Sequence, residues 1–259
     1  MEDSDSHACG GEYLEQSGFG TERLEADLRA AFPHARVARV DRDTIRRKGA
    51  IGRVLQEMAA GSIDILVGTQ MIAKGHDFPA VTLVGVVSAD VGLGLADFRA
   101  AERTFQLITQ VAGRTGRGSK GGRVAVQTFY PQHYAIKAAA TYDFEGFTRK
   151  ELELRRELGY PPFMSLVRAL VHGWNAERVH QAAKDLADKL KATFDETQMR
   201  ILGPAEPPLY KLKGRTRMHL LLKCPNLEAV LPTLKRVADT FPNDNNLAVV
   251  LDVDPVSML

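Results

Sequence analysis

The sequence predicts two domains, an α/β domain followed by an α+β domain. The 259 residues are enough for about two domains of ordinary size. Short apolar runs alternate with helical patterns up to residue 129, and this alternation is typical of a parallel sheet. The pattern changes after Tyr130, so we place the boundary between Tyr130 and Pro162. The expected parts are a loop at 1–20, the α/β domain at 21–142, and the α+β domain with a leading helix at 143–259.

The expected elements of the α/β domain are short and alternate. Thr21 is the expected N-cap of the first helix, because acidic residues follow it in the first turn. The runs at 63–67 and 81–87 are nearly all apolar, so we expect strands of a parallel sheet that is covered on both faces. The expected strands are 36–40, 63–67, 81–87 and 124–129, and the expected helices are 21–33, 51–59 and 98–110.

The α+β domain is expected to begin with two helices, at 134–140 and 144–158. The second helix is highly charged and should end at Gly159, since the two prolines that follow prevent continuation. The later order of strand, helix, strand, strand, helix and strand is the ferredoxin-like arrangement. These six elements are expected at 163–171, 176–194, 199–202, 219–223, 227–241 and 247–253.

Composition is that of a globular protein outside the membrane. Apolar residues make up 44% of the chain and charged residues 25%, which is ordinary. The net charge of +2 is only weak support for an anionic partner. Cys9 and Cys224 cannot form a disulfide framework and fit a reducing compartment. Since no apolar run approaches the roughly 18 residues of a membrane span, and the N-terminus is acidic and polar, we expect a cytoplasmic protein.

The segment QVAGRTGR, Gln110 to Arg117, is the most informative one. It presents Arg114 and Arg117 at a loop that is broken by two glycines. A guanidinium group binds phosphate oxygens through paired hydrogen bonds and stays charged, and in phosphoryl transfer it stabilises charge on the γ-phosphate. The chain has no G-x-x-x-x-G-K-[ST] loop to hold the rest of a nucleotide. The segment therefore predicts half of a nucleotide site, although glycine–arginine runs also occur in plain nucleic-acid contacts.

A second segment, ILVGTQMIAKGHDF at 65–78, follows the end of an expected strand. Ligands of α/β proteins bind at the carboxyl ends of parallel strands. Taken alone, the segment is more typical of a helix cap followed by a solvated turn, and we interpret His76 as a solvated residue. Because the arginine segment is expected at the same edge of the sheet, the two together favour a ligand site.

The third segment, YKLKGRTRMHLLLK at 210–223, is basic and contains no acid. Gly214 places a turn near its centre. A charged run is usually only a solvated surface, but this one is compact, unbalanced and next to an aromatic residue, so we interpret it as a nucleic-acid contact. Neutralised phosphates should give an affinity that depends on salt and not on base sequence. Its basic residues are Lys211, Lys213, Arg215, Arg217 and Lys223.

Together, GTQMIAKGHDF and QVAGRTGR resemble motifs V and VI in the second, RecA-like lobe of superfamily 2 helicases. The residue sequence is more similar still to one family, the primosomal replication-restart helicases PriA (primosomal protein N′). The resemblance extends over nearly the whole chain from about Cys9 onward. Its further segments are GTERLE at 20–25, DRDT at 41–44, DFRAAERTFQL at 97–107, YPPF at 160–163, GPA at 203–205 and DVDP at 252–255.

The resemblance implies a RecA-like lobe with a mostly parallel sheet, followed by a ribosomal-S10-like DNA-binding domain. Enzymes of this kind bind ATP between two lobes, and the phosphate loop and the metal-binding acid come from the first lobe. Arg117 would then be the arginine finger and Arg114 would assist it. Gln110, Gly75 and Asp77 would lie on the nucleotide side.

Thr69 would contact the DNA backbone by the same resemblance, since a short hydroxyl suits a phosphate oxygen. The resemblance further implies ATP and Mg²⁺ in the intact enzyme. The family also carries a cysteine-rich zinc insertion, of which this chain retains Cys9, with Ser6 three residues earlier. One thiolate cannot hold tetrahedral zinc, so we expect no zinc here, and we interpret Cys224 as a small buried residue.

The expected function is that of a C-terminal fragment of an ATP-dependent 3′-to-5′ DNA helicase, which binds branched DNA and restarts replication by primosome assembly. The fragment alone should hydrolyse no ATP, because the lobe with the phosphate loop is absent. The expected partners are branched and single-stranded DNA, single-stranded-DNA-binding protein and other primosome proteins. One alternative is a non-catalytic nucleic-acid-binding module. Another is a different superfamily 2 remodeller, such as a branch-migration helicase, against which DFRAAERTFQL and DVDP argue.

Overall fold

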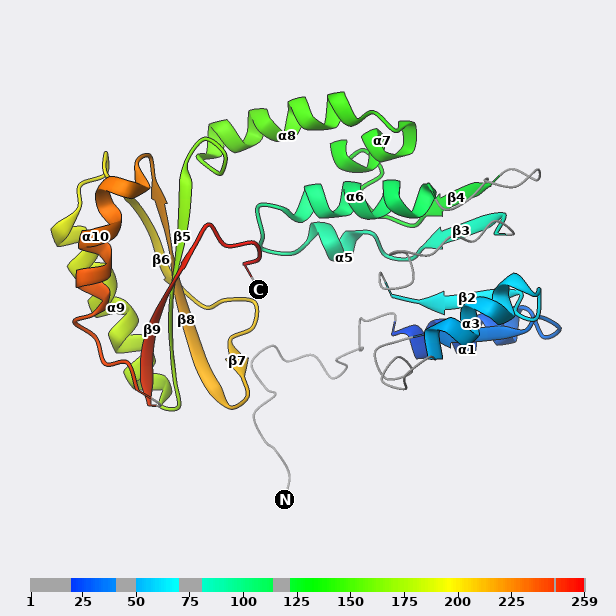
Figure 1. Ribbon diagram of the computed structural model, residues 1–259, viewed down its shortest axis with the longest axis horizontal. Coiled ribbons are helices and arrows are strands. Elements are labelled where there is room, and N and C mark those ends of the chain that lie inside the picture. Colours follow the sequence, from blue (N-terminus) through cyan, green and yellow to red (C-terminus); the bar gives the residue numbers. More distant parts are fainter. Residues whose placement is uncertain (1–19, 41–49, 70–80, 114–121, 245, 259) are drawn as a thin grey trace, which may run out of the picture. The chain divides into compact units, whose positions relative to one another are not determined.

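Two compact units make up the structure (Figure 1), which is a computed structural model. It describes residues 20–40, 50–69, 81–113, 122–244 and 246–258. The first unit comprises the chain up to Ala89 together with Leu107–Phe129, and the second comprises Asp90–Gln106 and everything from Tyr130 onward. Helix α6 (Ala100–Ala112) is continuous across this division, so its residues belong to both units.

The first unit contains two pairs of parallel strands. In one pair, Val37 lies opposite Ile65 and Val40 lies opposite Gly68. In the other pair, Leu83 lies opposite Arg123. The strands are β1 (Val37–Val40), β2 (Ile65–Gly68), β3 (Leu83–Val86) and β4 (Arg123–Val126), and the described helices that belong wholly to this unit are α1 (Thr21–Ala31) and α3 (Ala50–Ala59).

Helix α1 begins differently from the prediction. Gly20 is its N-cap, Thr21 is already helical, and no side chain caps the helix. The predicted N-cap at Thr21 is therefore wrong. An acidic residue still stabilises the helix, because Glu25 forms ion pairs with Arg29 at 2.8 Å and with Arg39 of β1 at 3.0 Å. The helix is thus tied to the neighbouring strand through side chains and not through a cap.

Strands β3 and β4 are also less buried than expected. Exposed and half-buried residues alternate along both strands, and Leu83 is 62% exposed. Since successive residues of a strand point to opposite faces, one face of this pair is open to solvent among the described residues. The expectation of a strand covered on both faces was therefore wrong at 81–87. An apolar run shows that a strand can be buried, whereas actual burial depends on what packs against each face.

The second unit begins with a group of helices. They are α5 (Asp90–Leu93), the first part of α6, α7 (Tyr134–Thr141) and α8 (Phe144–Leu158). Asp143 caps α8 by accepting a hydrogen bond from the backbone N–H of Gly146 at 2.8 Å. The helix ends at Gly159 in the left-handed conformation, which glycine adopts without steric cost. Both ends of α8 are where the sequence predicted them.

An antiparallel sheet forms the rest of the second unit, with the strand order β6-β8-β5-β9 and the short β7 beside β8. Helices α9 and α10 pack on one face of this sheet (Figure 1). Strand β8 begins four residues before the predicted start at His219 and pairs with β5 along its length, from Gly173 opposite Thr216 to Ser165 opposite Cys224. In chain order the elements are β5 (Ser165–Gly173), α9 (Ala176–Thr193), β6 (Arg200–Ala205), β7 (Lys211–Leu212), β8 (Arg215–Cys224), α10 (Leu227–Ala238) and β9 (Leu247–Val253).

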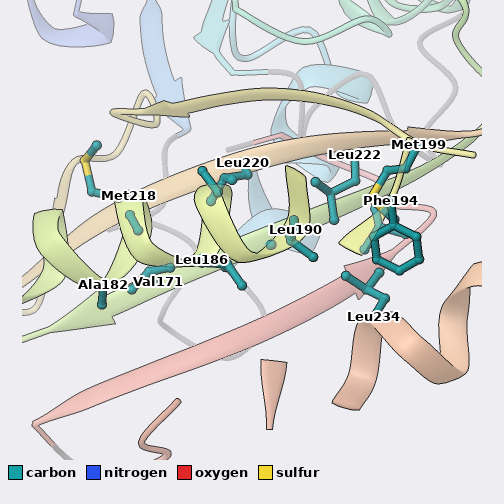
Figure 2. Packing of buried hydrophobic residues seen from close by; sticks show 14 of the residues in the cluster. Val171, Ala182, Leu186, Leu190, Phe194, Met199, Met218, Leu220, Leu222 and Leu234 are labelled. Atoms are coloured by element: carbon teal, nitrogen blue, oxygen red, sulfur yellow. The ribbon is translucent and has the colours of Figure 1, made fainter. Parts of the chain in front are cut away.

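The core of the second unit lies between this sheet and its helices (Figure 2). Leu186 and Leu190 of α9 pack with Leu220 and Leu222 of β8, and all four are fully buried. Cys224 ends the same strand and is also fully buried, which raises the pKa of its thiol to about 11. In the part of the chain that the structure describes, no helix is long and apolar enough to cross a bilayer.

Candidate functional site

The structure describes only some of the residues that were predicted to contact the nucleotide or the DNA backbone. Gln110 is half-buried in the last turn of α6, and Thr69 is exposed directly after β2. The arginine segment thus follows the C-terminal end of α6. The predicted residues outside the described ranges are Arg114, Arg117, Gly75, His76 and Asp77.

Helix α6 is held at its first half by the aromatic residues of the second unit. The Phe105 ring stacks on Phe147 of α8 with ring centroids 4.2 Å apart and an angle of 4° between the planes. Phe98, just before the helix, stacks on Tyr160 at 5.2 Å. Offset or parallel stacking of buried rings adds to the free energy gained by burying their surface. These contacts fix the first half of α6 within the second unit.

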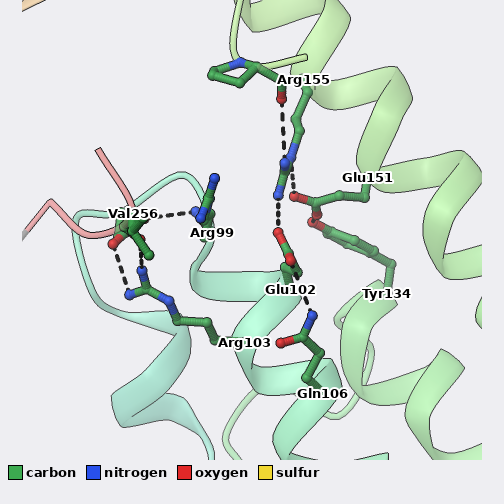
Figure 3. Close-up of polar contacts among 10 residues, drawn as sticks. Arg99, Glu102, Arg103, Gln106, Tyr134, Glu151, Arg155 and Val256 are labelled. Carbon is green, nitrogen blue, oxygen red and sulfur yellow. Dashed lines mark hydrogen bonds and ion pairs between the residues drawn. The ribbon is translucent and has the colours of Figure 1, made fainter. Parts of the chain in front are cut away.

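A partly buried polar cluster joins α6 to α8 (Figure 3). Arg155 donates to Glu102 of α6 at 2.6 Å and to Glu151 of its own helix at 2.7 Å. Tyr134 of α7 donates its hydroxyl to Glu151 at 2.6 Å. Burial, followed by this hydrogen bond, raises the pKa of Tyr134. We call Glu102, Tyr134, Glu151 and Arg155 the polar cluster of α6.

The chain after β9 is anchored at the start of the same helix. The Asp97 carboxylate accepts hydrogen bonds from Arg103 at 2.9 Å and from the backbone N–H of Met258 at 3.1 Å. Arg103 in turn donates to the backbone carbonyl of Val256 (Figure 3). The side chain of Asp97 is fully buried, and a buried carboxylate is stable only when it is paired. The last described residues therefore help to hold the start of α6.

Sequence reasoning missed the polar cluster of α6, because α8 was interpreted only as a charged helix. A usable signal was present. Phe147, Glu151 and Arg155 are spaced four residues apart, so they share one helix face, and the apolar Phe147 identifies that face as the inner one. Glu151 is accordingly only 6% exposed.

The basic segment forms the expected turn. Strands β7 and β8 make a hairpin in which Leu212 lies opposite Arg215. The two residues between them, Lys213 and Gly214, have φ values of 51° and 80°. Two successive residues with positive φ are typical of the two-residue turn that suits twisted strands. The prediction of a turn at Gly214 is confirmed.

The structure divides the basic residues of this segment into outward and inward ones. Lys211 and Lys213 are exposed, and Arg215 is half-buried with its guanidinium 5.3 Å from the centroid of the Trp174 ring. Arg217 is buried, with 7% of its surface exposed, and donates to the backbone carbonyl of Leu209 at 3.0 Å. Burial, followed by the charge of Arg168, lowers the pKa of Arg217.

Lys223 is also an inward residue. Its ammonium group donates to the backbone carbonyl of Leu158 at 2.7 Å and lies 3.7 Å from the centroid of the Tyr160 ring. Burial and the charge of Arg200 lower its pKa. Lys223 therefore joins strand β8 to the end of α8, and the outward basic set is reduced to Lys211, Lys213 and Arg215.

Metal ligands do not gather among the described residues, where no three histidine, cysteine, aspartate or glutamate side chains come together. Cys224 lies in the core of the second unit, and Cys9 is outside the described ranges. A structural zinc site needs four nitrogen or sulfur ligands. That this chain holds no zinc stays a prediction.

Comparison with known proteins gives two domain matches in order along the chain. Residues 16–119 match the helicase conserved C-terminal domain, and residues 156–256 match the primosomal protein N C-terminal domain.

Curated relatives match nearly the whole chain. The replication restart protein PriA of Bacillus subtilis (strain 168) is 41% identical over 254 residues, which is 97% of this chain and 31% of the relative. The PriA proteins of Synechocystis and Haemophilus influenzae are 40% and 38% identical over 96% and 95% of this chain. The chain spans between 30% and 34% of the length of these relatives.

Proposed function

We propose that this chain, which belongs to the replication restart protein PriA family, supplies the second lobe and the DNA-binding domain of an ATP-dependent DNA helicase. The observation that carries the proposal is the succession of the two domain matches on a chain that its relatives match almost throughout. In the longer protein the activity is 3′-to-5′ unwinding of branched DNA, which allows a primosome to assemble and replication to restart.

The nucleotide part of the proposal concerns the segment 110–117, which begins in the last turn of α6. Arg117 is the arginine finger on the γ-phosphate, and Arg114 assists it. Gln110, Gly75 and Asp77 complete this side of the ATP site, while the phosphate loop and the Mg²⁺-binding acid belong to the other lobe. The support is chemical: the segment carries two permanent cations within five residues of the last residue of α6 in the sequence, and transferred phosphoryl groups are stabilised by such cations.

The fold part of the proposal assigns a RecA-like lobe to 21–142 and a ferredoxin-like, ribosomal-S10-like domain to 143–259, with 1–20 as the remnant of a cysteine-rich segment. Parallel pairing of β1 with β2 and of β3 with β4 supports the first assignment. The antiparallel order β6-β8-β5-β9 supports the second, because it places the first and third strands of a β-α-β-β-α-β unit at the centre.

The DNA part of the proposal assigns phosphate contacts to Lys211, Lys213 and Arg215 on the β7–β8 hairpin, and a backbone contact to Thr69. We assign Arg217 a different task from the one predicted, since its hydrogen bond to Leu209 supports the chain that leads into the hairpin. Branched DNA, single-stranded-DNA-binding protein and other primosome proteins are the proposed partners. A protein with this role in a bacterium acts in the cytoplasm.

ATP hydrolysis tests the enzymatic proposal. In the longer protein that contains both lobes, Arg117→Ala should lower DNA-stimulated turnover by about 10³-fold or more, while Arg123→Ala, an exposed arginine at the start of β4, should leave it nearly unchanged. This chain alone should show no hydrolysis above background. Turnover of ATP by the chain alone, stimulated by single-stranded DNA, would contradict the assignment of half a site.

A non-catalytic nucleic-acid-binding module is the second candidate, favoured by the outward charge of the hairpin. It predicts that a preparation of the longer protein binds DNA through this chain and gains no activity from Arg117. Equal turnover of the wild type and the Arg117→Ala variant would favour this second candidate.

A further inference from the structure

Trp174 is the single tryptophan of the chain, and 55% of its surface is exposed. It lies between β5 and α9, and its backbone N–H donates to the carbonyl of Asn246 at 3.3 Å. A tryptophan side chain gains a large free energy from burial, so an indole left open is a candidate contact residue. The backbone around this indole is fixed, because the residue before it, Gly173, pairs with both neighbouring strands.

The indole is supported by the β7–β8 hairpin. A Cβ atom at Gly214 would come within 2.8 Å of the Trp174 ring, so the ring packs directly on the backbone of the turn. Arg215 brings its guanidinium to 5.3 Å from the ring centroid, within the range of a cation–π interaction. These two contacts hold the ring in one place while more than half of the residue's surface stays open.

Positive charge gathers on the hairpin beside the indole. Lys211 and Lys213 are exposed on the same hairpin as Arg215, and among the described residues none of the three forms an ion pair. Burial, followed by the charges of Arg215 and Arg217, lowers the pKa of the nearby His172. A pre-ordered aromatic ring inside a positive field is the combination that binds single-stranded nucleic acid, through base stacking and phosphate contacts.

We propose that Trp174 and the hairpin residues Lys211, Lys213 and Arg215 form a binding site for single-stranded nucleic acid. One base stacks on the indole, and the basic side chains bind the flanking phosphates. The site deepens the proposed DNA contact of the hairpin and rests on it for its biological role. Paired bases are stacked inside their duplex and offer no free face, so the indole should favour single strands whereas the lysines bind either form.

The sole tryptophan makes the experiment direct, because the intrinsic indole fluorescence of this chain comes from Trp174 alone. We would titrate the chain with a 20-residue oligothymidylate and with a duplex of the same length. The single strand should quench the fluorescence to saturation, and the duplex should quench it much less at equal occupancy. Occupancy is measured independently from the anisotropy of a label on the nucleic acid.

Variants then separate stacking from charge. Trp174→Ala should weaken single-strand binding on the order of 5- to 100-fold and duplex binding by less than about twofold, and Trp174→Phe should recover part of the loss because it keeps a π-face. Phe32→Ala is the matched control, since Phe32 is 53% exposed and lies at the end of α1. It should change neither affinity. Circular dichroism shows whether each variant is folded.

Several results would overturn the inference. Quenching by an acidic polypeptide, polyglutamate, equal to that by the oligonucleotide would reduce the site to charge alone. Equal losses of single-strand and duplex affinity in Trp174→Ala would exclude stacking. If Trp174→Ala binds normally while Lys211→Gln and Lys213→Gln lose affinity, the inference fails and the proposed DNA contact stands; if no variant loses affinity, both fail. Should Trp174→Ala not fold, the wild-type quenching and the Trp174→Phe affinity decide.

Discussion

Arg155 and Arg215 are both half-buried arginines whose guanidinium groups lie over aromatic rings, at 5.1 Å from the Phe98 centroid and 5.3 Å from the Trp174 centroid. Their surroundings differ. Arg155 forms ion pairs with Glu102 and Glu151, whereas no described acid pairs with Arg215. A guanidinium group over an aromatic ring therefore occurs both in a structural contact, at Arg155, and in a candidate binding site, at Arg215. The two arginines differ in whether carboxylates neutralise their charge.

The largest effect is expected on stability, from a substitution that removes a carboxylate partner of Arg155. Glu151→Ala leaves the mostly buried Arg155 with a single carboxylate partner, Glu102, and removes the acceptor of Tyr134. Because a buried charge that loses its partner is strongly destabilising, we expect the free energy of unfolding to fall by about 3 kcal/mol. Urea denaturation measures it.

Glu153→Ala is the control on the same helix, since Glu153 is exposed and pairs only with Lys150 among the described residues. We expect a change below about 0.5 kcal/mol. Similar losses in the two variants would mean that burial does not distinguish these glutamates.

Next in size is the loss of the outward charges. Replacing Lys211, Lys213 and Arg215 together by glutamine should weaken single-strand binding by about tenfold or more, and should reduce the slope of log affinity against log salt by about 2, at roughly 0.7 for each phosphate contact. Stability should change by less than about 0.5 kcal/mol. Affinity measured between 50 and 200 mM salt gives the slope, and an unchanged slope would remove the hairpin from the interface.

A smaller effect is expected at the support of the indole. Gly214→Ala places a Cβ against the Trp174 ring at a φ of 80°, so we expect a loss of about 1 kcal/mol in unfolding free energy and a shift in tryptophan emission. Gly52→Ala in α3 meets open space and should stabilise by about 0.5 kcal/mol. An emission spectrum that does not change in Gly214→Ala would show that the ring does not rest on the turn.

The smallest effect concerns Tyr134, whose pKa is raised in the folded state. Tyrosine in an unfolded chain ionises near pH 10. The folded protein therefore keeps its proton longer, and the stability that this hydroxyl provides is complete below pH 10 and is lost as the pH rises beyond it. Between pH 9 and 10.5 the wild type should lose up to about 1 kcal/mol more than Tyr134→Phe, measured by urea denaturation. If the unfolding free energies of the two proteins changed equally with pH, the hydrogen bond of Tyr134 to Glu151 would be contradicted.

The sequence was most informative where local chemistry decides the structure. Asp143 and Gly159 fix the two ends of α8, and strand β9 has both of its predicted ends. The start of β8 was missed because Arg215 and Arg217 belong to the basic run that was interpreted as a nucleic-acid contact, and the strand was expected to begin only at the apolar stretch that follows. Arg217 is accommodated in a strand since a backbone carbonyl accepts its hydrogen bond, and that acceptor is set by tertiary structure.

The candidate site was predicted in part for a similar reason. The turn at Gly214 and the basic residues could be identified from composition and spacing, because a tight turn has strict residue preferences. Trp174 lies far from the hairpin in the sequence, so only the pairing of β5 with β8 places it beside Gly214. Likewise, the partnership of Arg155 with Glu102 joins residues that no local pattern relates.

Cys224 has a practical consequence. Its thiol is fully buried at the end of the central strand β8 and its pKa is about 11, so near neutral pH it is neither accessible nor a thiolate. An aromatic disulfide reagent can modify it only after the strand has separated from its neighbours. In a Cys9→Ser chain, the rate at which the Cys224 thiol is modified therefore measures how often strand β8 opens. Nucleic acid bound at the opposite end of β8 should lower this rate if binding stabilises the whole strand.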